Sequence, residues 1–138
     1  MKNICTLAAS ILFLAVSTPC MAEITFENVS PARARELGIN LQGKANGPKE
    51  AWIKLEFKPE GELKEFKHVS LEISDGDRFL LGWTPLKDKR SSSGNVVVGL
   101  MANRAFLENV TLRLVTGATW ERGHDLRVKD FVDLKQLR

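Results

Sequence analysis

VSLEISDGDRFLLGW, residues 69–83, is the stretch that decides the fold of this chain. Apolar and polar residues alternate on both sides of a turn sequence, which is typical of a half-buried β-hairpin. A three-residue loop at residues 74–76 would pair Leu71 with Phe79 and give the hairpin one apolar face. A two-residue loop would mix polar and apolar side chains on both faces, because a slip by one residue inverts every side chain. The alternation therefore predicts the three-residue loop, with its glycine in the left-handed position.

Strand patterns recur on both sides of this hairpin. Residues 51–57 alternate most clearly, with Trp52 on the polar face. Residues 96–101 are apolar almost throughout, which predicts a strand buried on both faces. Weaker strand patterns occur at residues 23–29, 39–41 and 110–114. A last strand pattern begins near residue 126 and extends to about residue 132.

Turn and helix signals separate these strands. Ser30 is a good N-cap, Pro31 suits the first helical position and Gly38 can end a helix, so a short helical turn is expected near residues 30–38. Turn residues also gather at residues 43–48 and 59–62. The polar residues 84–95 predict a long connecting loop.

These patterns together predict a mainly β protein. The expected architecture is an antiparallel β-sandwich, immunoglobulin/fibronectin-like or jelly-roll-like, with about seven or eight short strands; a small barrel is also open. The cysteine and tryptophan spacing of true immunoglobulin domains is missing, and the chain has no tyrosine for a tyrosine corner.

The first 22 residues predict a secretory signal peptide. Lys2 is followed by ten mostly apolar residues, 7–16, and small side chains at positions 20 and 22 favour cleavage after Ala22. Ten residues form a helix of about 15 Å, half of a bilayer core of roughly 30 Å, so no integral membrane segment is expected in the mature chain. The protein is therefore expected in the periplasm or outside the cell, with residues 23–138 as a single β-sandwich domain.

Composition then limits the chemistry of that domain. Cys5 and Cys20 are the two cysteines of the chain, so the mature domain is expected to have no disulfide, thiol nucleophile or cysteine metal site. The chain carries 20 basic and 17 acidic residues, and Lys2 is the one charge of the first 22, which leaves a net charge of +2. This near-neutral balance indicates no nucleic-acid partner.

Two features suggest a binding surface. Lys87, Lys89 and Arg90 make the start of the 84–95 loop basic, which suits an anionic surface or simply keeps the loop soluble. Trp52 is on the polar face of its predicted strand, and Trp120 is beside a predicted turn. Neither is therefore expected on an apolar strand face, and tryptophan is enriched at interfaces. These five residues are the candidate binding residues.

Catalytic and metal motifs are not found. No zinc-ligand spacing joins His68 or His124, and no nucleophile elbow frames the serines of residues 91–93. No catalytic residue, metal or cofactor is therefore predicted. Asn28 and Asn109 begin glycosylation sequons whose use depends on a eukaryotic secretory route.

Three functions remain as hypotheses. The first is an exported, non-catalytic binding or interaction domain, whose partner is another protein, with a glycan or an anionic surface as the alternative. The second is a structural or accessory subunit of an exported assembly. The third is a small hydrolase that uses His68 or His124.

Overall fold

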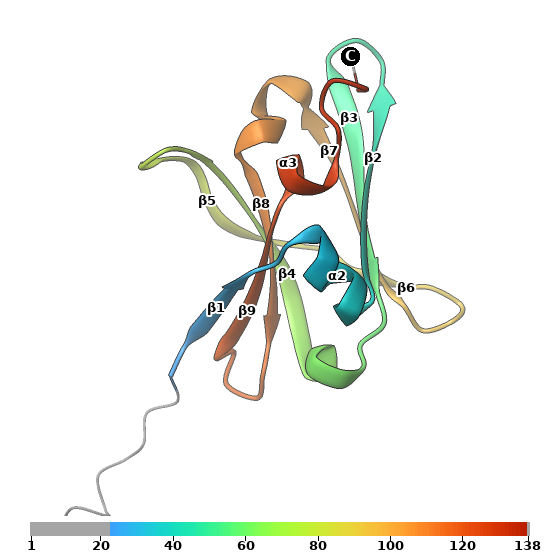
Figure 1. Cartoon of the computed structure of the whole chain (residues 1–138), viewed down its shortest axis with the longest axis vertical. Coiled ribbons are helices and arrows are strands. Elements are labelled where there is room, and N and C mark those ends of the chain that lie inside the picture. Colours follow the sequence, from blue (N-terminus) through green and yellow to red (C-terminus); the bar gives the residue numbers. More distant parts are fainter. Residues whose placement is uncertain (1–22, 138) are drawn as a thin grey trace, which may run out of the picture.

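The computed structural model describes residues 23–137; the predicted signal peptide and its cleavage after Ala22 lie outside these residues. Within them the chain forms nine β-strands in two sheets (Figure 1). The strands are β1 Thr25–Asn28, β2 Ile39–Asn46, β3 Glu50–Phe57, β4 Phe66–Asp75, β5 Arg78–Leu86, β6 Lys89–Arg90, β7 Val96–Asn103, β8 Val110–Thr116 and β9 Arg122–Arg127. The helical segments are α2 Pro31–Leu37, η1 Gly61–Leu63, η2 Arg104–Asn109 and α3 Val128–Phe131.

The two sheets form the predicted sandwich. The five-stranded sheet has the order β1-β9-β8-β4-β5, and the four-stranded sheet has the order β2-β3-β7-β6. Every pair of neighbours is antiparallel except β1 and β9, which are parallel. The order β2-β3-β7-β6 opposite β9-β8-β4-β5 corresponds to strands A-B-E-D opposite G-F-C-C′ of an immunoglobulin-type sandwich. The mainly β, sandwich-like prediction is therefore confirmed, with one strand more than expected.

The core lies between the sheets. The buried apolar side chains of both sheets form one cluster, and α2 and α3 lie along the side where β9 and β2 approach each other (Figure 1). Strand β3 shows how sequence alternation builds this core, because successive side chains of a strand point to opposite faces. Its inward side chains are at most 1% exposed: Ala51, Ile53, Leu55 and Phe57. The predicted strand at residues 51–57 is confirmed with its predicted buried face.

Helix α2 is also confirmed by its predicted caps. The Ser30 side chain accepts a hydrogen bond from the backbone N–H of Arg33 at 3.1 Å, and Pro31 takes the first helical position. Gly38 ends the helix in the left-handed conformation, with φ of 72°.

The predicted loop of the β4–β5 hairpin is wrong. A two-residue turn at residues 76–77 closes the hairpin, and register shifts farther along bring Leu71 opposite Thr84 rather than Phe79. Alternation determines the register of a strand only where one of its faces is buried. Nearly all of β5 is exposed, so burial does not set its register, and irregular pairing absorbs the extra residues.

The predicted loop at residues 84–95 is correct only in part, because residues 91–95 form a loop before β7 but residues 84–86 and 89–90 are in strands. Strand β5 continues to Leu86, and the short strand β6 pairs with β7, so two residues connect the two sheets at this point. Backbone pairing with β4 and β7 holds these polar residues in strands. The polarity of these residues does not show that they pair with other strands, because the preference of a segment for strand structure depends on its neighbouring strand.

Three other boundaries differ from their predictions. Residues 96–101 are buried on one face only, because Gly99 and its neighbours on the outer face are partly or fully exposed. Strand β2 continues through most of the predicted loop at residues 43–48, because it pairs residue for residue with β3. At the end of the chain, Val128 begins helix α3 and Val132 follows it, so neither belongs to the last strand.

Candidate functional site

A stack of two aromatic rings and one guanidinium group lies on the outer surface of the five-stranded sheet. The guanidinium carbon of Arg113 is 3.9 Å from the ring centroid of Phe26 and 3.9 Å from that of Trp83. These side chains come from β8, β1 and β5, which are not neighbours in sequence. A cation at this distance from a ring face is attracted by the ring quadrupole, so the stack orders both rings.

Asp125 fixes the centre of this stack. Its two carboxylate oxygens accept hydrogen bonds from Nε and from a terminal nitrogen of Arg113 at 2.6 and 2.7 Å. The side chains of Arg113 and Asp125 are only 18% and 13% exposed. Gly123 leaves room for the Phe26 ring, because a β-carbon there would lie 2.5 Å from a ring carbon. The guanidinium is thus held by charge, hydrogen bonds and both rings.

Trp120 lies on the same side of this sheet. Its ring packs edge-on against His68, with the ring centroids 5.1 Å apart. His68 pairs with Val115 of β8, two residues after Arg113, and both β8 residues point away from the core. Trp120 has a φ of 60°, which is rare for a bulky residue. We call Phe26, His68, Trp83, Arg113 and Trp120 the aromatic face.

The hairpin next to the aromatic face exposes more apolar surface. Phe79 is 70% exposed, and Leu80 and Leu81 are 49% and 40% exposed. Strand β5, which carries them, is the last strand of its sheet and projects from the side of the molecule (Figure 1). Such an apolar edge strand can pair with another chain, and soluble proteins usually cover or charge it.

A separate groove lies on the outer face of the four-stranded sheet. Its volume is about 630 Å³, and it gathers three of the five predicted binding residues: Trp52, Lys87 and Lys89. Trp52 is 46% exposed. Its β3 neighbours and the facing residues of β2 and β7 complete the lining: Gln42, Gly43, Lys44, Ile53, Lys54, Val97 and Gly99. We call this the Trp52 groove.

The two remaining predicted residues lie elsewhere. The Arg90 guanidinium carbon is 6.0 Å from the ring centroid of Phe66, and Arg90 does not line the groove. Trp120 belongs to the aromatic face of the other sheet. The basic loop predicted from Lys87 to Arg90 therefore divides at β6, where Lys89 and Arg90 point in opposite directions.

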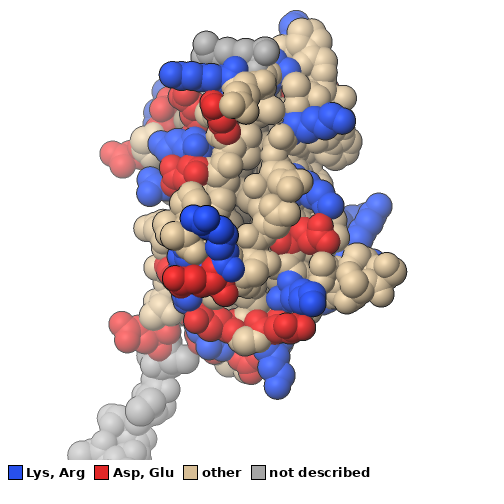
Figure 2. All heavy atoms as spheres, turned by 45° about the vertical axis from the view of Figure 1, so that its right-hand side comes forward, with Lys and Arg blue, Asp and Glu red and all other residues tan. Residues whose placement is uncertain are grey.

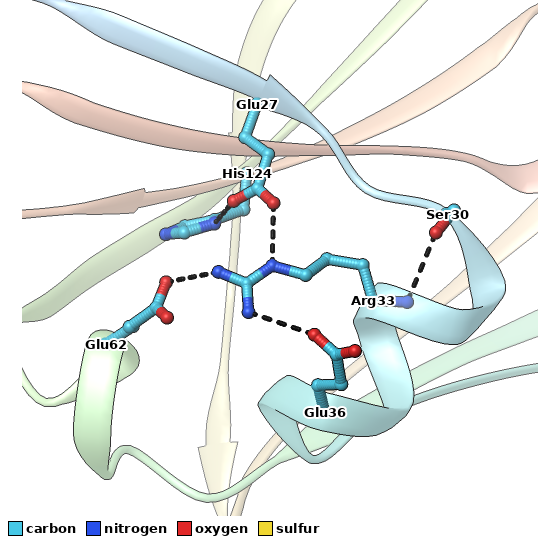
Figure 3. A network of polar contacts seen from close by, with 6 residues as sticks. All are labelled: Glu27, Ser30, Arg33, Glu36, Glu62 and His124. Carbon is cyan, nitrogen blue, oxygen red and sulfur yellow. Dashed lines mark hydrogen bonds and ion pairs between the residues drawn. The ribbon is translucent and has the colours of Figure 1, made fainter.

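An ion-pair network ties helix α2 to the five-stranded sheet and to η1 (Figure 3). Arg33 donates to Glu27 at 2.7 Å, to Glu62 at 2.6 Å and to Glu36 at 3.3 Å. Glu27 also accepts from Nδ1 of His124 at 3.2 Å. The network joins β1, α2, η1 and β9, so it positions the first residues of the described chain against the sandwich.

The histidines do not form a catalytic triad. His124 is 5% exposed, and its Nε2 is buried with no hydrogen-bond partner. Across residues 23–137, no serine or threonine hydroxyl hydrogen-bonds to either histidine. Within the same part of the chain, no group of three His, Cys, Asp or Glu side chains could hold a metal ion.

Hydrogen bonds lower the pKa of three carboxyl groups. The pKa of Glu62 falls mainly because Arg33 donates to it, and the pKa of Arg33 rises in turn. Asn95, and then Lys54, lower the pKa of Glu56. The pKa of Glu121 is lowered by its own backbone N–H and by Thr119. Each carboxylate is thereby favoured in its charged form.

Arg33→Met is expected to reduce the loss of stability in acid. The folded pKa of Glu62 lies below its unfolded pKa of about 4.3, so its contribution is present above that pH and is lost as the pH falls through the folded pKa. Without Arg33, the pKa of Glu62 should return toward its ordinary value. The variant should therefore be less stable near pH 7, with a smaller further loss on acidification.

Urea unfolding midpoints at pH 7 and at about pH 3.5 measure this effect. Arg35→Met is the matched control, because Arg35 lies on the same helix and forms no ion pair within residues 23–137. Identical pH profiles for the two variants would contradict the assignment.

Basic and acidic side chains are interspersed over much of the surface. Figure 2 shows them mixed around the lower end of the molecule, with basic side chains along the edge where the loop before β7 protrudes. Among residues 23–137, no helix has the length and apolar character needed to cross a membrane. Comparison with protein-family models, curated proteins and solved structures finds no match to this chain.

Proposed function

We propose that this protein is an exported, non-catalytic binding domain whose partner is another protein. The observation that carries the proposal is the ordered stack of Phe26, Arg113 and Trp83 on an otherwise exposed sheet surface. Tryptophan and arginine are the residues most enriched at protein–protein hot spots. Because Asp125 already fixes Arg113, little side-chain entropy would be lost when a partner binds.

The neighbouring edge strand supports a protein rather than a sugar as the partner. Within residues 23–137, β5 pairs with β4 alone, so its other edge can accept a strand from a partner. The exposed Phe79 would add apolar contact area beside the new strand. The guanidinium already occupies one face each of Phe26 and Trp83, which leaves less ring surface on which a sugar could stack.

Photocrosslinking in the cells that produce the protein tests this proposal. Phe79 is replaced by the photoreactive p-benzoylphenylalanine, and the same residue at Met101 provides the control. Met101 is 44% exposed but lies on the opposite sheet. A discrete adduct to a different protein is expected from position 79 and not from position 101.

The partner identified in this way is then purified and its affinity measured by calorimetry. Trp83→Ala should weaken binding by about tenfold or more, a loss of about 1.4 kcal/mol. Trp52→Ala removes an equally large and similarly exposed ring from the other sheet and should change the affinity by less than about twofold. An adduct to a second copy of this chain, or equal affinity for the Trp83→Ala protein, would overturn the proposal.

A further inference from the structure

We propose that the Trp52 groove is a second binding site, and that its ligand is an acidic oligosaccharide. The groove is independent of the proposed protein-binding surface, because it lies on the outer face of the other sheet. The two proposals can therefore fail separately.

Charge selects an anionic ligand. Four lysines line the groove, Lys44, Lys54, Lys87 and Lys89, and no acidic side chain lines it. Lys54 is partly neutralised by Glu56, with Nζ and Oε2 2.9 Å apart. The other three form no ion pair within the described part of the chain. Unpaired cations around one hollow raise the local concentration of anions.

The aromatic floor selects a ring-shaped ligand. A β-carbon at Gly99 would lie 3.8 Å from a carbon of the Trp52 ring, so the missing side chain leaves open space beside that part of the ring. The exposed part of Trp52 can stack on the C–H face of a pyranose, because that face is apolar and its weakly positive hydrogens match the negative face of the ring. Gln42 adds an amide that can both donate to and accept from sugar hydroxyls.

The kind of cation and the shape of the groove favour a saccharide over other anions. Lysine ammonium groups are compact point charges, which suit separated carboxylates or sulfates along a chain, whereas arginine is favoured for bidentate phosphate recognition. A volume of about 630 Å³ is within the usual range for small-molecule sites and can take a few sugar rings. Trp52 stands on the sheet face beside Lys44 and Met101, its paired residues, rather than on a protruding tip that could enter a membrane.

Calorimetry with the purified protein tests this site against a panel of defined probes. The acidic probes are a galacturonate hexasaccharide and a heparin-derived hexasaccharide, and the neutral probe is maltohexaose. Polyglutamate and vesicles of phosphatidylglycerol with phosphatidylcholine represent an acidic peptide and a lipid surface. We expect at least one acidic hexasaccharide to bind at least about tenfold more tightly than every other probe, and its binding to weaken as salt shortens the Debye length.

Three variants assign that binding to the groove. Trp52→Ala should weaken it by about tenfold or more. Lys89→Gln should weaken it and reduce its salt dependence. Gly99→Leu should also weaken it, because the new side chain would fill the floor while every charge and Trp52 are kept. The backbone at Gly99 is not in the left-handed region, so leucine can be accommodated there.

Adjacent or similar residues outside the groove are the controls. Arg90→Gln makes the same change of charge one residue away from Lys89, on the other side of β6, and should leave the affinity within about twofold. Trp120→Ala removes a ring from the other sheet and should also have little effect.

Several results would overturn the proposal. These are equal binding of maltohexaose, tightest binding of polyglutamate or of the vesicles, binding that Lys89→Gln and Arg90→Gln weaken equally, and no binding of any hexasaccharide. Protein crosslinking at Phe79 would be unaffected by any of them, so the proposed protein partner is judged by separate data.

Discussion

Phe57→Ala is expected to lower the free energy of unfolding by about 3–5 kcal/mol, the usual cost of removing a buried aromatic ring. Phe57 is 1% exposed and packs edge-on against Phe66, with the ring centroids 5.0 Å apart. These rings come from the last residue of β3 and the first residue of β4, which belong to different sheets, so the cavity would open between the sheets at that end of the sandwich. Because domains of this size are stable by only about 5–15 kcal/mol, the loss would be a large part of the total.

Trp52→Ala is the matched control for this prediction. Trp52 lies on the same strand and is an even larger aromatic residue, but its side chain points outward and is 46% exposed. We expect a smaller loss of about 1–2 kcal/mol, because about half of the residue stays in water after folding and its removal leaves no closed cavity. Urea unfolding of both proteins gives the comparison. Equal losses would mean that β3 does not present its faces as the sandwich requires.

The regular parts of this fold could be predicted because their causes are local. Strict alternation in β3 identified both its length and its buried face, and the caps Ser30 and Gly38 identified α2. In both elements the residues that determine the structure lie within one strand or one helical turn.

The irregular parts could not be predicted because their causes are not local. The register of β5 depends on two irregularities in its pairing with β4. No sequence pattern indicates where they lie, because β5 has no buried face that would set its register. Strand β6 exists because β7 offers it a partner, which polar residues 84–95 cannot reveal. The parallel pairing of β1 with β9 likewise joins the two ends of the described chain.

The candidate sites divide in the same way. Alternation placed Trp52 on the polar phase of its strand, although its proximity to Lys87 and Lys89 appears only in the folded sheet. The aromatic face was missed apart from Trp120. Alternation along β8 does place Arg113 outward, but nothing nearby in sequence indicates that Phe26 and Trp83 flank it.

Arg113→Ala is expected to lower the free energy of unfolding by about 2–3 kcal/mol. It would remove two charge-assisted hydrogen bonds and two cation–π contacts, and it would leave the Asp125 carboxylate, 13% exposed, without its partner. A fully buried pair would cost more, and the partial exposure of both groups reduces the effect. Trp83 would lose the group that orders its ring.

The planar fork of arginine is the feature that this stack needs. Arg113→Lys keeps the charge but cannot bind both carboxylate oxygens side by side, so it should restore less than half of the lost stability. The double variant with Arg113→Ala and Asp125→Ala should lose about 1–2 kcal/mol less stability than the sum of the two single losses, because the pair acts as a unit. Urea unfolding follows the stability, and the difference in tryptophan fluorescence between each protein and its Trp83→Phe counterpart follows the order of the Trp83 ring. Full restoration by lysine, or strict additivity, would show that Arg113 contributes its charge alone, and the surface proposed to bind a protein would then lack an ordered centre.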